Sequence, residues 1–352
     1  MQNPFTTTFS KIPDDTYIPT DQITEILENF QYDRPSESVY KITGVRGSGK
    51  TVLLGKVERE LSSDLWKDRG YIVYRLAPAR DMLSQLASLL YRDGYMPTDS
   101  KNRSISLSFN VLGTGGGIGF EKEGQDHLDT GIALETALNK ATVSGKRIVI
   151  GIDEVSRTPE MIEFASEFGK WLRSDLAVYL VCTGLYENIE QLYNVKNLTF
   201  FRRATTIKTE PLSEIRMSEM YRSRLNIDIQ TAREYAGLTR GYPYAFQELG
   251  IQLFKNRDSS KEEIIQRLKA ELFAYSYEKI WEELSKEDRD LVRILAHKEE
   301  SKREDIIRFM DKPNNYSVYR DRLMKRGIIT TRYAFVSLAL PFFDEYVNEY
   351  WQ

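Results

Sequence analysis

A glycine-rich segment near the start of the chain contains the residue types that bind phosphate. Residues 44–51 read Gly-Val-Arg-Gly-Ser-Gly-Lys-Thr and match the pattern G-x-x-x-x-G-K-[ST] in full. Glycines let the backbone curl so that successive N–H groups point at phosphate oxygens, and the lysine adds a mobile positive charge. The predicted nucleotide-binding set is this pattern and the residue after it: Gly44, Val45, Arg46, Gly47, Ser48, Gly49, Lys50, Thr51 and Val52.

The flanking residues place this segment between a strand and a helix. Residues 39–43 are a short β-type run, and apolar residues recur at helical spacing over 52–61. A phosphate loop requires this context, because the following helix presents its positive N-terminus to the anion. We therefore expect Lys50 to contact the β- and γ-phosphates of ATP and the Thr51 hydroxyl to bind Mg²⁺.

A second apolar run ends in two acids. Residues 148–152 read Ile-Val-Ile-Gly-Ile and lead into Asp153 and Glu154, which has the form of a Walker B strand. The strand would deliver both carboxylates to the carboxyl edge of the sheet, beside the phosphates. Asp153 would hold Mg²⁺ through water and Glu154 would polarise the attacking water. The alternative is a strand that ends in two solvated acids.

Further along, Thr183 ends the next apolar run, 176–183, and Arg202 and Arg203 follow a helical segment. Thr183 could orient the attacking water near the γ-phosphate, or it is a plain strand-end threonine. One of the two arginines could stabilise the transferred phosphoryl group across a subunit interface. The alternative is a surface pair that binds acidic side chains. Cys182 is interpreted as a small core residue.

The composition is that of a folded protein and excludes several classes of site. The chain has 352 residues, which suits two or three domains, and a net charge of -3, which provides no global attraction to nucleic acid or anionic lipid. One cysteine excludes an intramolecular disulfide, and two histidines disfavour a His-based triad or metal site. We find no signal peptide and no run of about 18 apolar residues, so a cytoplasmic location without membrane partners is expected.

Strands that alternate with helices predict an α/β fold with a parallel sheet covered on both faces. Residues 71–76 form another candidate strand. Residues 103–123 alternate around a Gly-Thr-Gly-Gly-Gly turn, which we interpret as an inserted β-hairpin rather than a second phosphate site, because no helix follows the turn. Helical patterns dominate from about residue 212. The predicted domains are a P-loop core over 1–211, a helical lid over 212–274 and a C-terminal domain over 275–352.

The C-terminal domain has the element pattern of a winged helix. We predict helices over Leu284–Ala296, over Lys302–Met310 with Ser301 as its cap, and over Tyr316–Arg326 in the recognition position, followed by a tight ribbon over 327–336. Such a domain binds duplex DNA or a protein partner, and the sequence leaves both open.

The charge of this region agrees with a surface for phosphates. Residues 301–332 hold nine basic groups and four acidic ones, 9 minus 4 or +5, in a chain that is acidic overall. A solvated basic face is the alternative. The predicted DNA contacts are Arg303, Ser317, Arg320, Lys325 and Arg332.

The ordered set of these motifs resembles the AAA+ ATPases, and most closely the archaeal-type group related to origin-recognition initiators and STAND NTPases. The resemblance implies that Asn3 and Phe5 belong to an N-terminal strip that packs on adenine. It also implies that Arg240 and Pro243 belong to the G-x-P element of the lid, where Arg240 is either a sensor 2 phosphate contact or a plain loop residue. The chain departs from the group at Pro19-Thr20, where relatives often carry Gly-Arg.

These features together predict a P-loop NTPase with an αβα parallel sheet, a helical lid and a C-terminal winged helix. The expected function is Mg²⁺-dependent ATP binding and hydrolysis that drives assembly on, or remodelling of, DNA or a protein–DNA complex. ATP and ADP, a homo-oligomer, duplex DNA and a protein partner are the expected partners. The alternative is a STAND-like signalling or scaffold protein, gated by nucleotide, whose C-terminal domain contacts protein. A small-molecule kinase is disfavoured because no acceptor-site motif is present.

Overall fold

The computed structural model describes residues 2–8, 11–78, 80–96, 130–196 and 198–351. They form two compact units. We call residues 24–42 and 54–207 the sheet unit, and residues 1–23, 43–53 and 208–352 the C-terminal unit. The hairpin predicted at 103–123 lies outside the described residues. The predicted domain boundary at 211/212 and that at 274/275 both fall inside the C-terminal unit and remain predictions.

Five strands form the parallel sheet of the sheet unit, in the order β2-β3-β4-β1-β5. Tyr71 of β2 pairs with Arg147 of β3, and Ile148 of β3 pairs with Val178 of β4. All seven residues of β4 are buried, as are five of the six in β3, which explains why both strands read as unbroken apolar runs. The strands are β1 (Val39–Thr43), β2 (Tyr71–Leu76), β3 (Arg147–Ile152), β4 (Val178–Gly184) and β5 (Thr205–Lys208).

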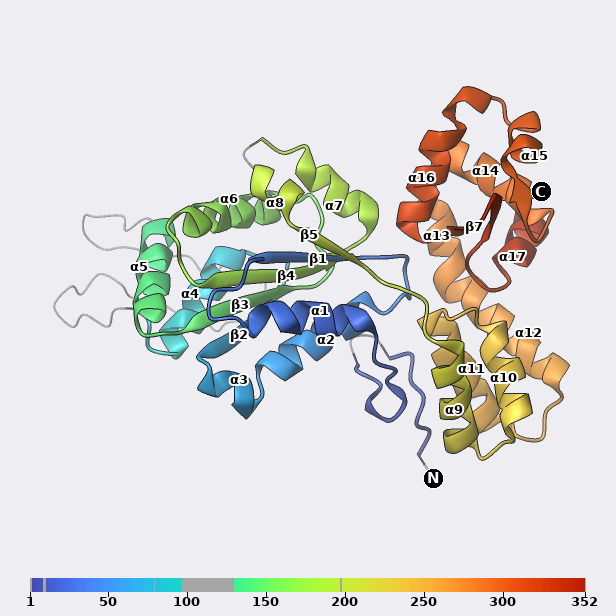
Figure 1. Ribbon diagram of the computed structural model, residues 1–352, viewed down its shortest axis with the longest axis horizontal. Helices are drawn as coiled ribbons and strands as arrows, with labels where there is room; N and C mark the ends of the chain where they lie inside the picture. The colour runs from blue at the N-terminus through green and yellow to red at the C-terminus, as the bar shows by residue number, and fades with distance from the viewer. Residues whose placement is uncertain (1, 9–10, 79, 97–129, 197, 352) are drawn as a thin grey trace, which may run out of the picture. The chain divides into compact units, whose positions relative to one another are not determined.

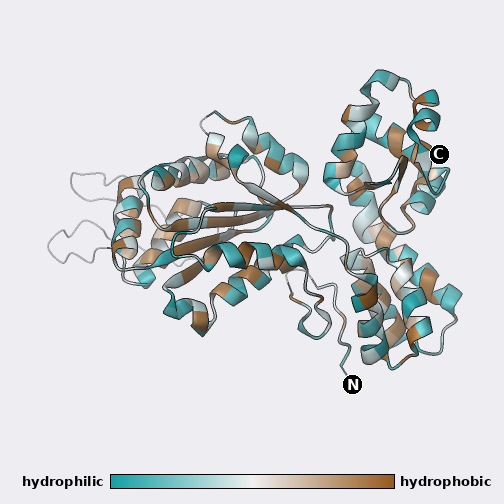
Figure 2. Cartoon of the chain, viewed as in Figure 1, coloured by the Kyte–Doolittle hydropathy of each residue, from teal (hydrophilic) through white to brown (hydrophobic). Residues whose placement is uncertain are grey.

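Helices cover both faces of this sheet, with α6 on one side and α1 on the other (Figure 1). Figure 2 shows largely hydrophobic strands between helices in which hydrophilic and hydrophobic residues alternate. The helices are α1 (Asp21–Phe30), α2 (Lys50–Leu61), α3 (Asp64–Asp68), α4 (Met82–Arg92), α5 (Thr130–Val143), α6 (Pro159–Arg173), α7 (Tyr186–Tyr193) and α8 (Thr199–Arg203). The predicted αβα layering is therefore confirmed.

The two faces of the sheet have different cores. On one face, Ile148, Ile150 and Ile152 of β3 join a cluster of aliphatic and aromatic side chains with α4, α5 and α6. On the other, the Phe30 ring meets Tyr71 and Tyr179 edge to face, with ring centroids 5.7 and 5.3 Å apart. Alternate residues of a strand point to opposite faces, so both cores hold the same strands in place. Packing on both faces therefore holds β3 in place, and Asp153 and Glu154 directly follow its last residue.

The C-terminal unit is mostly helical. Its elements are η1 (Asp14–Thr16), α9 (Glu214–Leu225), α10 (Ile229–Leu238), α11 (Pro243–Lys255), α12 (Lys261–Leu272), the π-turn η2 (Phe273–Tyr277), α13 (Glu278–Glu282), α14 (Lys286–Ala296), β6 (Ser301–Lys302), α15 (Arg303–Arg308), η3 (Pro313–Asn315), α16 (Tyr316–Arg326), β7 (Ile329–Arg332), β8 (Phe335–Leu338) and α17 (Phe343–Tyr350). One apolar cluster runs from Met217 of α9 to Val347 of α17, so these helices share a core. No helix within the described ranges is long and apolar enough to cross a membrane.

The last part of this unit has the order helix, helix, helix and ribbon that the sequence predicts, which is consistent with a winged helix. The ribbon β7–β8 gains a third strand, β6, because Ser301 pairs with Val336. The prediction that Ser301 caps the second helix is therefore wrong, and the helix begins at Arg303. The preceding helix α14 begins at Lys286 rather than at Leu284, since the Ser285 side chain caps it by accepting from Asp288 N.

Candidate functional site

The glycine-rich loop joins the end of β1 to the start of α2, as predicted. Lys50 is the first residue of α2, and Gly47 and Gly49 adopt φ values of +75° and +87°. Those left-handed conformations curl the loop and are available to glycine at little cost. The Lys50 ammonium donates to the carbonyl oxygens of Gly44 and Val45, both at 3.0 Å. The loop thus holds its own lysine beside the helix N-terminus.

A threonine after β5 forms hydrogen bonds to the loop, although no sequence motif marks it. Thr209 donates from its hydroxyl to Ser48 Oγ at 2.8 Å, and its backbone N–H donates to Thr43 O at 2.8 Å. A Cβ added to Gly44 would lie 1.9 Å from Thr209 Oγ1, so only glycine fits there. No local sequence signal marks Thr209, because the contact spans more than 150 residues of chain.

Tyr242 and Tyr244, in the segment predicted to be the lid, contact the same loop. The Tyr242 hydroxyl donates to Arg46 O at 2.6 Å, and Tyr244 N–H donates to Gly47 O at 3.2 Å. Burial raises the pKa of Tyr242, so this phenol stays protonated and donates. Pro243, a predicted nucleotide contact, lies 3.8 Å from where a Cβ on Gly49 would stand. The G-x-P element therefore does pack on the loop, mainly through the tyrosines that flank its proline.

The Arg46 side chain pairs with a carboxylate far along the chain. Arg46 Nη2 lies 3.0 Å from Glu283 Oε1, and both side chains are partly exposed. Arg46 Nε is buried without a hydrogen-bond partner, so the guanidinium is only partly satisfied here. Glu283 follows α13 and could not be linked to the loop from spacing alone.

In the sheet unit, Thr183 joins the two Walker B acids. Its hydroxyl donates to Asp153 Oδ1 at 2.5 Å and accepts from Glu154 N–H at 3.0 Å. Thr183 is fully buried. Glu154 is exposed and adopts φ +58°, a left-handed conformation that is uncommon for non-glycine residues. Thr183 therefore bridges the Asp153 carboxylate and the backbone of Glu154, and its predicted role in orienting the attacking water stays a prediction.

A third carboxylate lies beside β3. Glu58 of α2 occupies the space over Gly151, where a Cβ would come within 1.9 Å of its Oε1. Arg75 Nε donates to Glu58 Oε1 at 3.1 Å, and its Nη2 lies 3.0 Å from Oε2. Burial raises the pKa of Glu58, Arg75 opposes that shift, and the charge of Asp153 adds to it. The glycine within an otherwise apolar strand was the signal that a side chain approaches there.

The two arginines predicted to stabilise the transferred phosphoryl group of a neighbouring subunit both lie at the C-terminal end of α8. Arg202 and Arg203 are exposed. A role across a subunit interface stays a prediction for this pair.

The predicted adenine strip and the predicted sensor arginine have other contacts. Phe5 is buried in the lid, with its ring 5.7 Å from that of Tyr221, and Asn3 Oδ1 accepts from Phe5 N–H at 3.0 Å. Arg240 Nη1 donates to the carbonyls of Leu338 at 3.1 Å and Leu340 at 3.4 Å. In this structure Arg240 joins the lid to the C-terminal ribbon, and its phosphate contact stays a prediction.

The five predicted DNA contacts are dispersed over the C-terminal domain. Ser317, Lys325 and Arg332 are exposed. Arg320 Nη2 lies 2.8 Å from its neighbour Asp321, and Arg303 lies over the Tyr316 ring. Their role stays a prediction, but the neutralised Arg320 weakens the electrostatic part of the argument.

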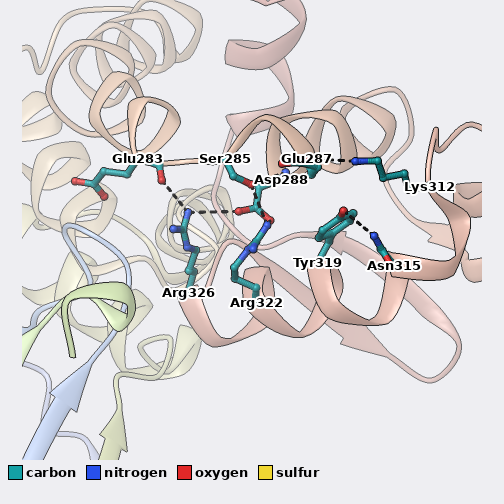
Figure 3. Close-up of polar contacts among 9 residues, drawn as sticks. All are labelled: Glu283, Ser285, Glu287, Asp288, Lys312, Asn315, Tyr319, Arg322 and Arg326. Atoms are coloured by element: carbon teal, nitrogen blue, oxygen red, sulfur yellow. Dashed lines mark hydrogen bonds and ion pairs between the residues drawn. The ribbon is translucent and has the colours of Figure 1, made fainter. Parts of the chain in front are cut away.

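Two other basic residues of α16 face inward rather than toward a ligand. Arg322 donates from Nε and Nη2 to Asp288 Oδ1 at 2.9 and 2.7 Å, and Arg326 Nη1 lies 3.9 Å from Asp288 Oδ2. Asp288 is fully buried on α14 (Figure 3). A count of charges along the chain cannot separate such structural cations from exposed ones, so the +5 overstates the charge available to DNA.

Comparisons with known proteins agree with this architecture. A family model described as a domain of unknown function, DUF8462, matches residues 274–347. No curated protein matches the chain. A Walker-type ATPase of Pyrococcus abyssi aligns at TM-score 0.58 and 16% identity, over 93% of this chain and 95% of that one. The ORC2 protein of Aeropyrum pernix, in ADPNP and ADP complexes, aligns at TM-score 0.56 and 13% identity over 95% of each chain.

At such identities the likeness shows the fold. This chain has the P-loop αβα fold of an archaeal Walker-type ATPase and of an origin-recognition protein. The predicted P-loop αβα fold is thereby confirmed, and the resemblance to origin-recognition proteins is shown as a likeness of fold.

Proposed function

We propose that this chain binds ATP with Mg²⁺ and hydrolyses it. The observation that carries the proposal is the loop from Gly44 to Thr51, which leaves β1, curls through Gly47 and Gly49 and ends where α2 begins. Backbone N–H groups of such a loop and the positive end of the helix bind phosphate together. Lys50 now donates to two loop carbonyls, and it would exchange them for phosphate oxygens.

The acids after β3 supply the second half of the proposed chemistry. β1 runs directly into the phosphate loop and neighbours β4 in the sheet, and β3 is the next strand. The Thr51 hydroxyl and the Asp153 carboxylate are hard oxygen donors of the kind that Mg²⁺ prefers, and Mg²⁺ needs few of them because it keeps several waters. Bound Mg²⁺ would neutralise charge on the phosphates. Glu154, exposed and held in one backbone conformation by Thr183, would take the proton of the attacking water.

For the output of the cycle, we propose assembly on DNA or on a protein–DNA complex through the C-terminal domain. Lys325 and Arg332 support it, because both are exposed and phosphate contacts need accessible cations. Copies of the chain would share ATP, with Arg202 or Arg203 completing the neighbouring site.

A second candidate has its own observation. Val318 is 60% exposed on α16, and exposed Asp321 shares the helix with it, which suits a protein-contacting surface better than a DNA-reading one. In that case nucleotide gates a signalling or scaffold protein, as in the STAND group.

The test is the ATP turnover rate with and without duplex DNA, measured for wild type, Glu154→Gln and Glu163→Gln. Glu163 is exposed on α6 and loses the same charge, so it is the matched control. We expect turnover to fall at least tenfold in Glu154→Gln only, with ATP binding retained. Stimulation by DNA that declines with salt supports the DNA output, and its absence together with nucleotide-dependent assembly supports the protein-contacting candidate. Wild-type turnover in Glu154→Gln would remove the catalytic assignment.

A further inference from the structure

Both the backbone carbonyl and the guanidinium of Arg46, in the phosphate loop, are bound by residues that precede α14. Its carbonyl accepts from Tyr242, whose hydroxyl also lies 2.7 Å from Ser276 Oγ in the π-turn η2. Its guanidinium pairs with Glu283 at 3.0 Å. A π-turn inside a helical stretch is rare and is often found at functional sites. Arg46 therefore links the loop to the residues just before α14.

Glu283 is in turn connected to α16. Arg326 Nη1 donates to the Glu283 carbonyl at 3.2 Å and approaches Asp288, which Arg322 also binds (Figure 3). Arg322 Nη2 donates to Ser285 Oγ at 2.9 Å, so the cap of α14 belongs to the same network. A contiguous set of ion pairs and hydrogen bonds thus runs from the phosphate loop to the helix in the recognition position.

The Arg46–Glu283 pair is the weak point of this network. Both side chains are more than a third exposed, at 41% and 35%. Ion pairs this exposed contribute little to the stability of the fold. Arg46 Nε has no hydrogen-bond partner although it is buried, so the guanidinium has a donor to spare. A terminal phosphate carries more charge than a carboxylate and accepts from a guanidinium in bidentate fashion. It would compete well for Arg46.

We propose that Arg46 is a switch between two acceptors, the Glu283 carboxylate and the terminal phosphate of a bound nucleoside triphosphate. This rests on the proposed ATP site. When the triphosphate takes Arg46, Glu283 loses its link to the loop, and the polar connection from the loop to α16 is broken while Asp288 keeps α16 attached to α14. A diphosphate lacks the third phosphate and leaves the pair in place. By linkage, whatever favours release of the C-terminal domain also favours ATP over ADP.

The experiment compares Glu283→Gln with Glu282→Gln, which removes the same charge one residue earlier. Glu282 is exposed and pairs with Lys279 at 2.7 Å rather than with Arg46. Dissociation constants for ATP and ADP are measured by calorimetry, and thermal unfolding checks that both variants fold. Glu283→Gln should bind ATP about two- to fivefold more tightly, the factor that an exposed ion pair can oppose, with ADP affinity unchanged. Glu282→Gln should match wild type.

Amide hydrogen exchange over residues 278–283 and α16 gives the second readout. ATP, but not ADP, should speed exchange there in wild type, and Glu283→Gln should show the faster exchange without nucleotide. In an Arg46→Gln background, Glu283→Gln should have no further effect on ATP affinity.

The outcomes distinguish a failure of the Arg46 switch from a failure of the proposed ATP site. If wild type binds no ATP, the proposed function fails and the switch fails with it. If wild type binds ATP but Glu283→Gln matches Glu282→Gln in both affinity and exchange, the switch is wrong and the ATP site stands. If Glu283→Gln tightens ATP and ADP equally, the pair does not sense the terminal phosphate and the switch is likewise overturned.

Discussion

Replacing Thr183 by valine tests whether this residue positions the two Walker B acids. The valine keeps the shape and removes the hydroxyl, which donates to Asp153 Oδ1 at 2.5 Å and accepts from Glu154 N–H at 3.0 Å. A hydrogen bond to a charged group contributes about 1.5–3 kcal/mol and a neutral one about 0.5–1.5 kcal/mol. Asp153 is only half-buried, so water replaces part of the loss. We expect the free energy of unfolding to fall by about 1–3 kcal/mol.

The effect on turnover should be larger than the effect on nucleotide binding. Without the hydroxyl, the Asp153 carboxylate can rotate and the left-handed conformation of Glu154 loses its support, so the general base is misplaced. We expect the ATP turnover rate to fall at least tenfold, about 1.4 kcal/mol in the barrier, with the ATP dissociation constant within about threefold of wild type.

Thr183→Ser is the matched control, because it keeps the hydroxyl and removes only a buried methyl group. Its stability should fall by about 0.5–1.5 kcal/mol from the small cavity, while its turnover stays within about threefold of wild type. The assay is steady-state phosphate release together with urea unfolding of all three proteins. A folded Thr183→Val protein that turns over within twofold of wild type would refute the positioning role.

Three further perturbations follow from single contacts. Gly47→Ala forces a side chain into φ +75° and places its Cβ 2.3 Å from the Tyr242 hydroxyl, so urea unfolding should report a loss of about 1–3 kcal/mol and no loss would contradict the packing of lid on loop. Asp288→Asn removes the buried charge that Arg322 binds, and because Arg322 is 31% exposed we expect about 2–3 kcal/mol of destabilisation that becomes smaller at high salt; a stability equal to that of wild type would count against the ion pair. Burial raises the pKa of the Cys182 thiol to about 12, so iodoacetamide should not label the native protein between pH 8 and 10 but should label it in urea; rapid native labelling would show that the strand opens.

The pKa of that thiol also sets a direction for stability against pH. The folded value lies above the ordinary value of 9.0, so the buried thiol contributes its full stability below about pH 9 and loses it as the pH rises toward 12. The loss begins only where the unfolded thiol ionises, so it does not affect stability near neutrality.

The two Walker segments and the strands could be predicted from sequence because their physics is local. A buried parallel strand needs an unbroken apolar run, and a phosphate loop needs glycines at fixed spacing before a helix, so residues 39–61 and 147–154 carried their own evidence. The helix boundaries in the C-terminal domain were less secure. Ser301 looked like a cap until its pairing with Val336 placed it in a strand, which is a long-range contact that overrides a local preference.

The role of each charged side chain depended on residues far away in the chain. Arg320, Arg322 and Arg332 are equivalent in a count of charges, yet one pairs with its neighbour, one binds a buried aspartate and one is exposed over the Tyr333 ring. Burial of Asp288 decided this, since a buried carboxylate must be paired while an exposed cation need not be.

By itself, the sequence determined that the chain forms a parallel αβα sheet with a phosphate loop between a strand and a helix, because backbone periodicity and glycine geometry are properties of short segments. Only the tertiary structure decided what holds that loop. Thr209, Tyr242 and Glu283 reach it from positions more than 150 residues away, and hydrogen-bond partners at such separations are set by how the core packs rather than by any local pattern. The fold was therefore readable from the chain, whereas the contacts through which the loop reaches the C-terminal domain were not.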